Sequence, residues 1–193
     1  MKGVSQTKKG LILGIILLVP GMLFSQSASW KTYNGELFFI SYPGEWFGVG
    51  GIDAIKMFSI NQEPDKRFDG ALLTEQEVDL QKFSPELFLQ MGVISIMMGT
   101  LNDEERQRED YYEEVFGSME PGLTNPSRGQ IMIDGLPGYY LTGDVPDKGI
   151  VAYVAMTIVG EEGFVFMGMQ SKEREPDVAS FMEKVIDTVG FGR

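Results

Sequence analysis

Histidine and cysteine are both absent from the 193-residue sequence. Without them, the Ser-His-Asp and Cys-His systems that activate nucleophiles are excluded, and zinc sites, which rely on the same side chains, are nearly excluded. Carboxylate chemistry, lysine chemistry and oxygen-ligated calcium or magnesium remain. No motif for these remaining chemistries stands out, so we predict a protein that is not an enzyme and has no catalytic residue, no metal site and no cofactor.

Basic residues are scarce as well. Sixteen Lys and Arg stand against 28 Asp and Glu, which gives a formal net charge of −12. Three of the lysines lie in the first ten residues, so residues 30–193 carry 13 basic and 28 acidic side chains and a formal charge of −15. Such a surface repels nucleic-acid phosphates and anionic lipids. We expect no nucleic-acid partner; a basic protein partner or a divalent cation fits the charge.

The first 29 residues have the order of a secretory signal peptide. Three lysines within Met1–Gly10 precede the apolar run Leu11–Phe24, and small or polar residues follow up to Ser29. The apolar run is shorter than the roughly 20 residues that a membrane-spanning helix needs. We predict a signal peptide over residues 1–29 and export to the periplasm or the exterior of a bacterial cell. The alternative is an uncleaved N-terminal anchor, which would be the only membrane contact.

Residues 30–193 are interpreted as a single domain, long enough to bury a core without disulfides. Apolar runs and alternating patterns predict strands over residues 30–33, 37–42, 54–61 and 71–80. Gly48–Gly51 is interpreted as a flexible stretch, and residues 62–70 and 120–127 as loops, because they are rich in glycine, proline or polar side chains.

Two helices are predicted. Ser84-Pro85-Glu86 suits a helix start, and the apolar residues that follow, up to Leu101, recur at helical spacing. A second helix is expected between Pro176 and Gly190, because its apolar residues follow the pattern of an amphipathic helix. These apolar residues are Leu87, Met91, Ile94, Met98 and Leu101 in the first helix, and Val178, Phe181, Met182, Val185, Ile186 and Val189 in the second.

Two hairpins are predicted in the second half of the chain. Strands over residues 128–133 and 136–143 flank Asp134-Gly135, a strong two-residue turn signal. Strands over residues 150–159 and 164–170 flank a glycine-containing turn, and both are apolar on their two faces. Strands without a polar face are buried on both sides, so we expect helices on each face of this sheet.

Three short motifs resemble those of PsbP-like domains. The run Phe39-Ile40-Ser41-Tyr42-Pro43-Gly44-Glu45-Trp46 is similar to their F-x-I-x-Y-P-x-x-W opening, and Asp134-Gly135-Leu136-Pro137-Gly138 is similar to their N/D-G-x-P hairpin. The closing helix, followed by Gly190-Phe191, resembles their last helix. The resemblance implies an α+β fold, an α/β/α sandwich with a central antiparallel sheet, and a role in docking on protein partners without a shared reaction.

Five residues are candidates for binding. Glu104 and Glu105 belong to an acidic stretch, residues 103–114, that suits calcium or a basic partner but lacks the spacing of a calcium loop and is interpreted as a solvated face. Tyr111 and Tyr112, in the same stretch, are candidates for a partner contact, with packing of an accessory helix as the alternative. Trp46 is interpreted as a core or rim anchor, with an aromatic ligand floor as the alternative. Most of the 12 methionines are interpreted as core residues rather than copper ligands.

Three functions follow from these observations. The leading hypothesis is an exported, non-enzymatic binding or assembly module that acts through protein contacts in the cell envelope. The first alternative is a protein that binds a small apolar ligand between the sheet and the first helix, where Phe88, Met91 and Met98 would line a pocket with Trp46 at its rim. The second alternative is a carboxylate-based hydrolase that uses acids of the 103–114 stretch.

Overall fold

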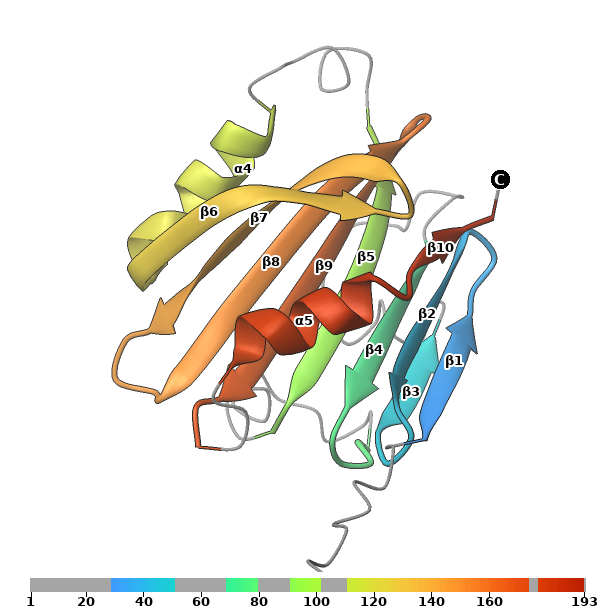
Figure 1. The fold of residues 1–193 in the computed structure, drawn as a ribbon, viewed down its shortest axis with the longest axis horizontal. Coiled ribbons are helices and arrows are strands. Elements are labelled where there is room, and N and C mark those ends of the chain that lie inside the picture. Colours follow the sequence, from blue (N-terminus) through green and yellow to red (C-terminus); the bar gives the residue numbers. More distant parts are fainter. Residues whose placement is uncertain (1–28, 51–68, 80–90, 102–110, 174–176, 193) are drawn as a thin grey trace, which may run out of the picture.

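The computed structural model describes residues 29–50, 69–79, 91–101, 111–173 and 177–192. Within these ranges, seven strands form one antiparallel sheet (Figure 1). Each strand is hydrogen-bonded to its neighbours in the order β3-β4-β5-β9-β8-β7-β6. Their bounds are Phe47–Gly50 (β3), Gly70–Thr74 (β4), Val93–Thr100 (β5), Glu162–Ser171 (β9), Ile150–Val159 (β8), Leu136–Val145 (β7) and Thr124–Ile133 (β6).

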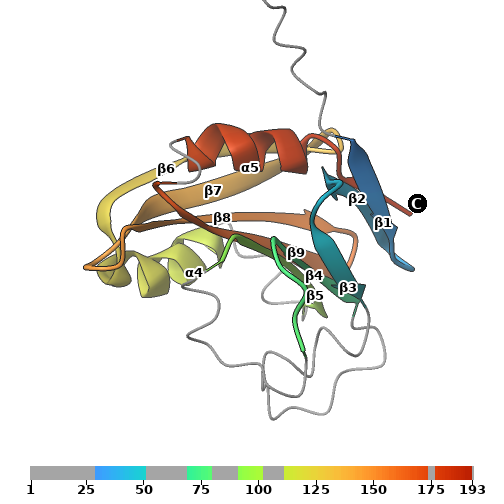
Figure 2. The same ribbon diagram turned by 90° about the horizontal axis from the view of Figure 1, so that it is seen from below.

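A smaller sheet and two α-helices complete the described part of the fold. The smaller sheet has the order β1-β2-β10, with β1 at Trp30–Asn34, β2 at Phe38–Pro43 and β10 at Gly190–Phe191. Helix α5 (Val178–Ile186) and this sheet lie on one face of the large sheet, and helix α4 (Tyr111–Met119) lies on the other (Figure 2). A short 3₁₀ helix, η1 (Glu120–Gly122), connects α4 to β6.

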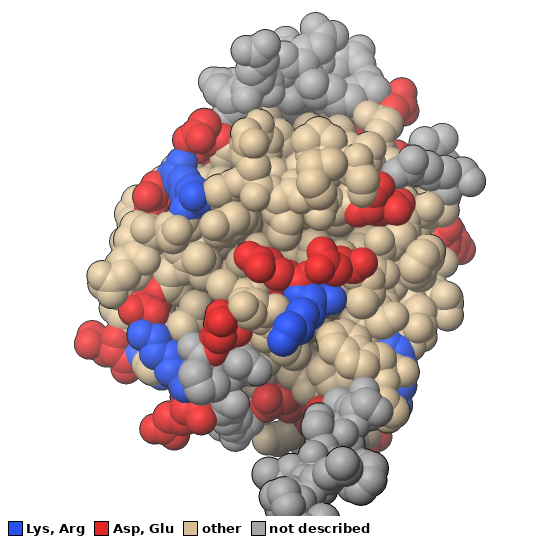
Figure 3. Space-filling model, in the orientation of Figure 1, with Lys and Arg blue, Asp and Glu red and all other residues tan. Residues whose placement is uncertain are grey.

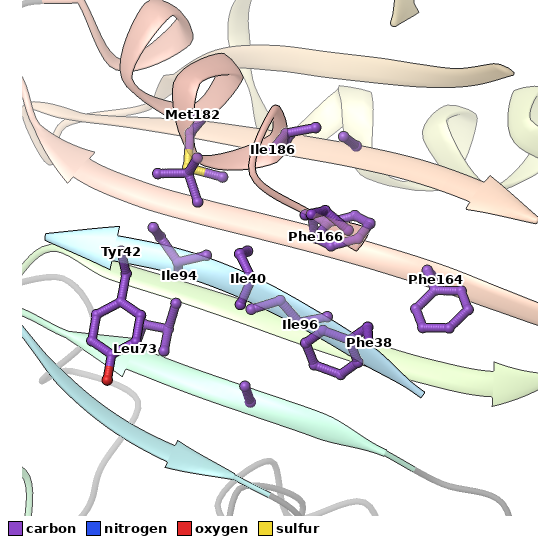
Figure 4. Packing of buried hydrophobic residues seen from close by; sticks show 14 of the residues in the cluster. Phe38, Ile40, Tyr42, Leu73, Ile94, Ile96, Phe164, Phe166, Met182 and Ile186 are labelled. Atoms are coloured by element: carbon purple, nitrogen blue, oxygen red, sulfur yellow. The ribbon is translucent and has the colours of Figure 1, made fainter. Parts of the chain in front are cut away.

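The main core lies between the large sheet, α5 and β2 (Figure 4). Ile40 of β2, Ile96 of β5 and Phe166 of β9 are fully buried there, and Met182 and Ile186 of α5 cover them. Ile94 and Ile96 of β5 both lie in this core, because alternate side chains of a strand point to the same face. The amphipathic pattern of the last helix therefore predicted its buried face.

Asp69 joins the smaller sheet to the large one. The residue is only 6% exposed. One carboxylate oxygen accepts the N–H groups of Glu36 and Leu37, in the β1–β2 turn, at 3.0 and 3.1 Å. The other accepts the N–H of Gly70, the first residue of β4, at 2.8 Å. A buried side chain thus provides acceptors for three backbone donors, which would be costly to leave unpaired.

Both predicted hairpins are confirmed. Asp134 and Gly135 have φ values of 48° and 74° and connect the paired residues Ile133 and Leu136, as in a type I′ turn. The β8–β9 turn is also two residues long, and its first residue, Gly160, has φ of 62°. The second strand of this hairpin begins at Glu162, two residues before the predicted start.

Several other predictions are corrected. Val93–Thr100, expected in the first helix, is strand β5; β9 pairs with it along its whole length and β4 pairs with its residues 93–97. The stretch interpreted as flexible provides most of β3, and the strand expected over 71–80 ends at Thr74. Strand β6 begins at Thr124, inside a predicted loop. The strand predicted over 54–61, residues 84–90 of the first helix and nearly all of the predicted signal lie outside the described residues.

Candidate functional site

Two of the sequence candidates, Tyr111 and Tyr112, start helix α4 and lie over the β6–β7 hairpin. The ring of Tyr112 is 4.4 Å from that of Tyr139 on β7, measured between centroids, and 6.1 Å from that of Tyr111. All three side chains are half-buried. Burial raises the pKa of the Tyr112 hydroxyl, and the neighbouring hydroxyls of Tyr139 and Tyr111 raise it further. We call these three residues the tyrosine patch.

Helix α4 is held on the sheet by a second, smaller core. Phe116 is 2% exposed and packs against Leu141 of β7 and against Val154 and Met156 of β8. Tyr112 belongs to the partly buried residues around this cluster. Tyr111 and Tyr139 belong to the same group. Packing of an accessory helix, the alternative interpretation, therefore accounts for the buried part of each ring in the patch.

Arg128 connects β6 to the first turn of α4 and to η1, which follows α4. Its guanidinium donates to the carboxylate of Glu113 at 2.5 Å, and also to the carboxylate of Glu120 in η1. Both acids lie in the segment that ends at β6, so this network fixes the tyrosine patch relative to the border of the sheet. A network of this kind orients a surface more than it stabilises it, because partly exposed ion pairs contribute little free energy.

An open hollow of about 260 Å³ lies beside the patch on the β6–β7 hairpin. Met132, at its border, is 58% exposed, the highest value among the exposed large apolar side chains of the described residues. Because Met132 pairs with Pro137 and Gln130 pairs with Tyr139, these four side chains share the face on which α4 lies. The lining residues are Gln130, Ile131, Met132, Pro137, Gly138 and Tyr139.

Trp46 lies in the main core, with 4% of its surface exposed and its ring 5.7 Å from that of Phe181 on α5. This is the position expected of a core anchor. The pocket hypothesised between the sheet and the first helix loses its premise, because Met98 is on strand β5 and is buried within the sheet layers. Phe88, another residue of that hypothesis, lies outside the described residues.

Glu104 and Glu105 also lie outside the described residues, so their interpretation stays a prediction. In the part of the chain that the structure describes, no three acidic side chains are grouped so that they could hold a metal ion. The helices of that same part are too short or too polar to cross a membrane. Sequence reasoning missed Arg128, Met132 and Tyr139, which the pairing of β6 with β7 brings to the site.

Comparisons with known proteins agree with this architecture. No protein-family model matches the sequence, and no curated protein matches it. The structure is similar to the solution structure of cyanobacterial PsbP (CyanoP) from Synechocystis sp. PCC 6803, with a TM-score of 0.51 over 86% of this chain and 94% of that chain. The fold is PsbP-like. At 14% sequence identity the match concerns the fold alone, and it confirms the α+β class expected from the motifs.

Proposed function

We propose that this protein is an exported, non-enzymatic binding or assembly module of the bacterial cell envelope that acts through contact with a protein partner. The tyrosine patch carries the proposal, because it combines half-buried tyrosines with the exposed Met132 beside an open hollow. Tyrosine and methionine are enriched at protein interfaces. The PsbP-like fold supports the proposal without specifying the partner.

The charge of the surroundings favours a basic partner. Seen from the α5 side, opposite the face on which α4 lies, the surface over β6 is largely uncharged (Figure 3). Three acidic residues, Glu113 and Glu114 of α4 and Glu120 of η1, lie in this region with one basic residue, Arg128 of β6. A basic surface that approaches this side would therefore be attracted, and the attraction would weaken as salt rises.

The test is affinity capture from a native envelope extract, with three versions of the processed chain. Wild-type protein is compared with Tyr111→Ser, which removes a ring of the patch, and with Phe39→Ser. Phe39 is a matched control, because it is an aromatic residue, 45% exposed, on the smaller sheet. We expect wild type and the Phe39 variant to enrich the same salt-sensitive partner, and the Tyr111 variant to lose it.

Two results would contradict the proposal. The first is that no partner is enriched over background by any folded version. The second is that Tyr111→Ser retains the partner while Phe39→Ser loses it, which would assign docking to the smaller sheet.

A further inference from the structure

Strand β6 is the border of the large sheet within the described residues, and the geometry of its hairpin determines where its backbone groups point. Antiparallel pairs alternate between pairs that exchange hydrogen bonds and pairs that do not. The two-residue turn closes on Ile133 and Leu136, so that pair exchanges hydrogen bonds. Counting back along β6, the N–H and C=O groups of Met132, Gln130 and Arg128 point away from β7.

Pro137 gives an independent check of this alternation. Pro137 is the residue opposite Met132. It has no N–H to donate, and its carbonyl accepts a hydrogen bond from the Thr157 hydroxyl of β8 at 2.9 Å. The two polar backbone positions of a strand residue point to the same side, so the backbone of Pro137 faces β8. Strand β7 therefore offers Met132 no backbone partner.

The part of β6 whose outward backbone groups have no partner on β7 has defined ends. On the N-terminal side, Asn125 has φ of 51° and Pro126 has no N–H group, while the pairing with β7 is irregular between Thr124 and Ser127. Proline and an irregular register are the devices that stop further strand pairing at a sheet border. On the C-terminal side the Asp134 turn ends the strand. Between these ends the edge carries no such device.

We propose that an extended, basic segment of the partner protein pairs with this edge and extends the large sheet beyond β6. Main-chain hydrogen bonds to Arg128, Gln130 and Met132 hold the segment, as in other cases of strand addition. Its basic side chains lie on the α4 face of the extended sheet, near the acids of α4 and η1, and its apolar side chains lie on the opposite face. This inference rests on the proposed docking function and specifies its partner and mode.

A second copy of this chain is a weaker candidate for the same edge. Both copies would bring a net charge of −12 or, without residues 1–29, −15 to the contact, and like charges oppose association. A basic segment is attracted by the same negative charge. Charge therefore distinguishes the two occupants that an open edge can accept.

The test uses a seven-residue synthetic peptide of alternating lysine and valine with blocked ends. Its control is the same peptide with N-methyl groups on alternate backbone nitrogens, which keeps the charge and removes strand pairing. Gln130→Pro removes the outward N–H of residue 130, and Gln130→Ala, its matched control, keeps that N–H. We expect the peptide to bind wild type and Q130A alike, with affinity for Q130P lower by roughly tenfold or more, the effect of losing a hydrogen bond and the fit around it.

Amide hydrogen exchange on the wild-type protein gives a readout that does not depend on the proline variant. In the free protein the amides of Arg128, Gln130 and Met132 should exchange fast, and those of Gly129 and Ile131 slowly. The peptide should slow the first three selectively. Equal binding of the N-methylated peptide, or no protection of these three amides, overturns the inference. If a partner is still captured through Tyr111 after that result, the docking function stands and only strand pairing fails.

Discussion

Asp69 and Asp177 show how single carboxylates organise backbone that the regular elements leave unpaired. Asp69 does so in the interior, between the two sheets. Asp177 does so at the surface, where it precedes α5 and accepts the N–H of Ser180 at 3.0 Å. A side chain in this position caps the helix by satisfying one of its first donors. Pro176, at which the sequence predicts the start of this helix, lies outside the described residues.

Asp177 leads to a prediction of pH dependence. The hydrogen bonds from Ser180 lower the pKa of its carboxyl below the ordinary value. A lowered folded-state pKa means that the charged form contributes stability above the ordinary pKa of about 3.9, and that this contribution is lost as pH falls through the folded-state pKa. We expect Asp177→Ala to lower the urea midpoint near neutral pH, and the difference from wild type to shrink progressively below about pH 4. A difference that grows on acidification would contradict this assignment.

At the scale of the element, helix α4 is a short helix that depends on one buried side chain. Nine residues are too few for a helix to be stable alone. Phe116 supplies the contact with β7 and β8. Arg128 forms ion pairs with Glu113 in the helix and with Glu120 just after it. The next residue, Gly117, is exposed, and a Cβ there would meet no atom within 4 Å. Adjacent positions should therefore respond to substitution in opposite directions.

We predict that Phe116→Ala lowers the free energy of unfolding by about 3–5 kcal/mol, the usual cost of removing a buried aromatic ring. Gly117→Ala should raise it by up to about 1 kcal/mol, because alanine loses less backbone freedom in a helix. Urea unfolding of both variants measures these changes. A destabilising Gly117→Ala would mean that this residue is not in open helical geometry.

Elements were predictable from the sequence where local chemistry determines them. The Asp134-Gly135 turn needs two residues at positive φ, which few residue pairs accept, and so the hairpin was found. Strand β5 was mistaken for a helix because it is buried over most of its length. A strand that is apolar on both faces fits a helical spacing as well as an alternating one, and Val93, Ile94 and Ile96 were the signal that favoured a strand.

The candidate site was predictable only in part, for a related reason. Tyr111 and Tyr112 stand out in a polar segment of the sequence. Tyr139 and Met132 become relevant only through strand pairing, although the register follows once the Asp134 turn is known. The β6 start was missed because Pro126 was interpreted as a loop residue, whereas a border strand tolerates proline.

At the scale of the whole molecule, strand β10 joins the two sheets. Phe191 is 7% exposed, and its ring lies 4.6 Å from that of Phe164 on β9. Its N–H donates to the carboxylate of Asp134 at 3.1 Å. Gly190 and Phe191 also pair with Phe39 and Phe38 of β2. This short strand of the smaller sheet thus contacts β2, the large sheet and the β6–β7 turn.

We predict that Phe191→Ala lowers the free energy of unfolding by about 3–5 kcal/mol. Phe39→Ala, on the exposed side of β2, should cost clearly less, because an exposed ring loses little contact with the core. Urea unfolding by tryptophan fluorescence suits the comparison, since Trp46 lies in the same core. Equal losses of unfolding free energy in the two variants would show that Phe191 does not connect the two sheets.

The pairing of β2 with β10 also determines when the molecule can finish folding. About 150 residues of chain separate the two strands, so closing this contact is entropically costly and comes late. Among the described strands, β1 is the only one that pairs with β2 before β10 has been made. The part of the core beside β2 therefore stays partly exposed until β10 pairs with β2. With this connectivity, the part of the core that β2 covers can close only after residue 191 has left the ribosome.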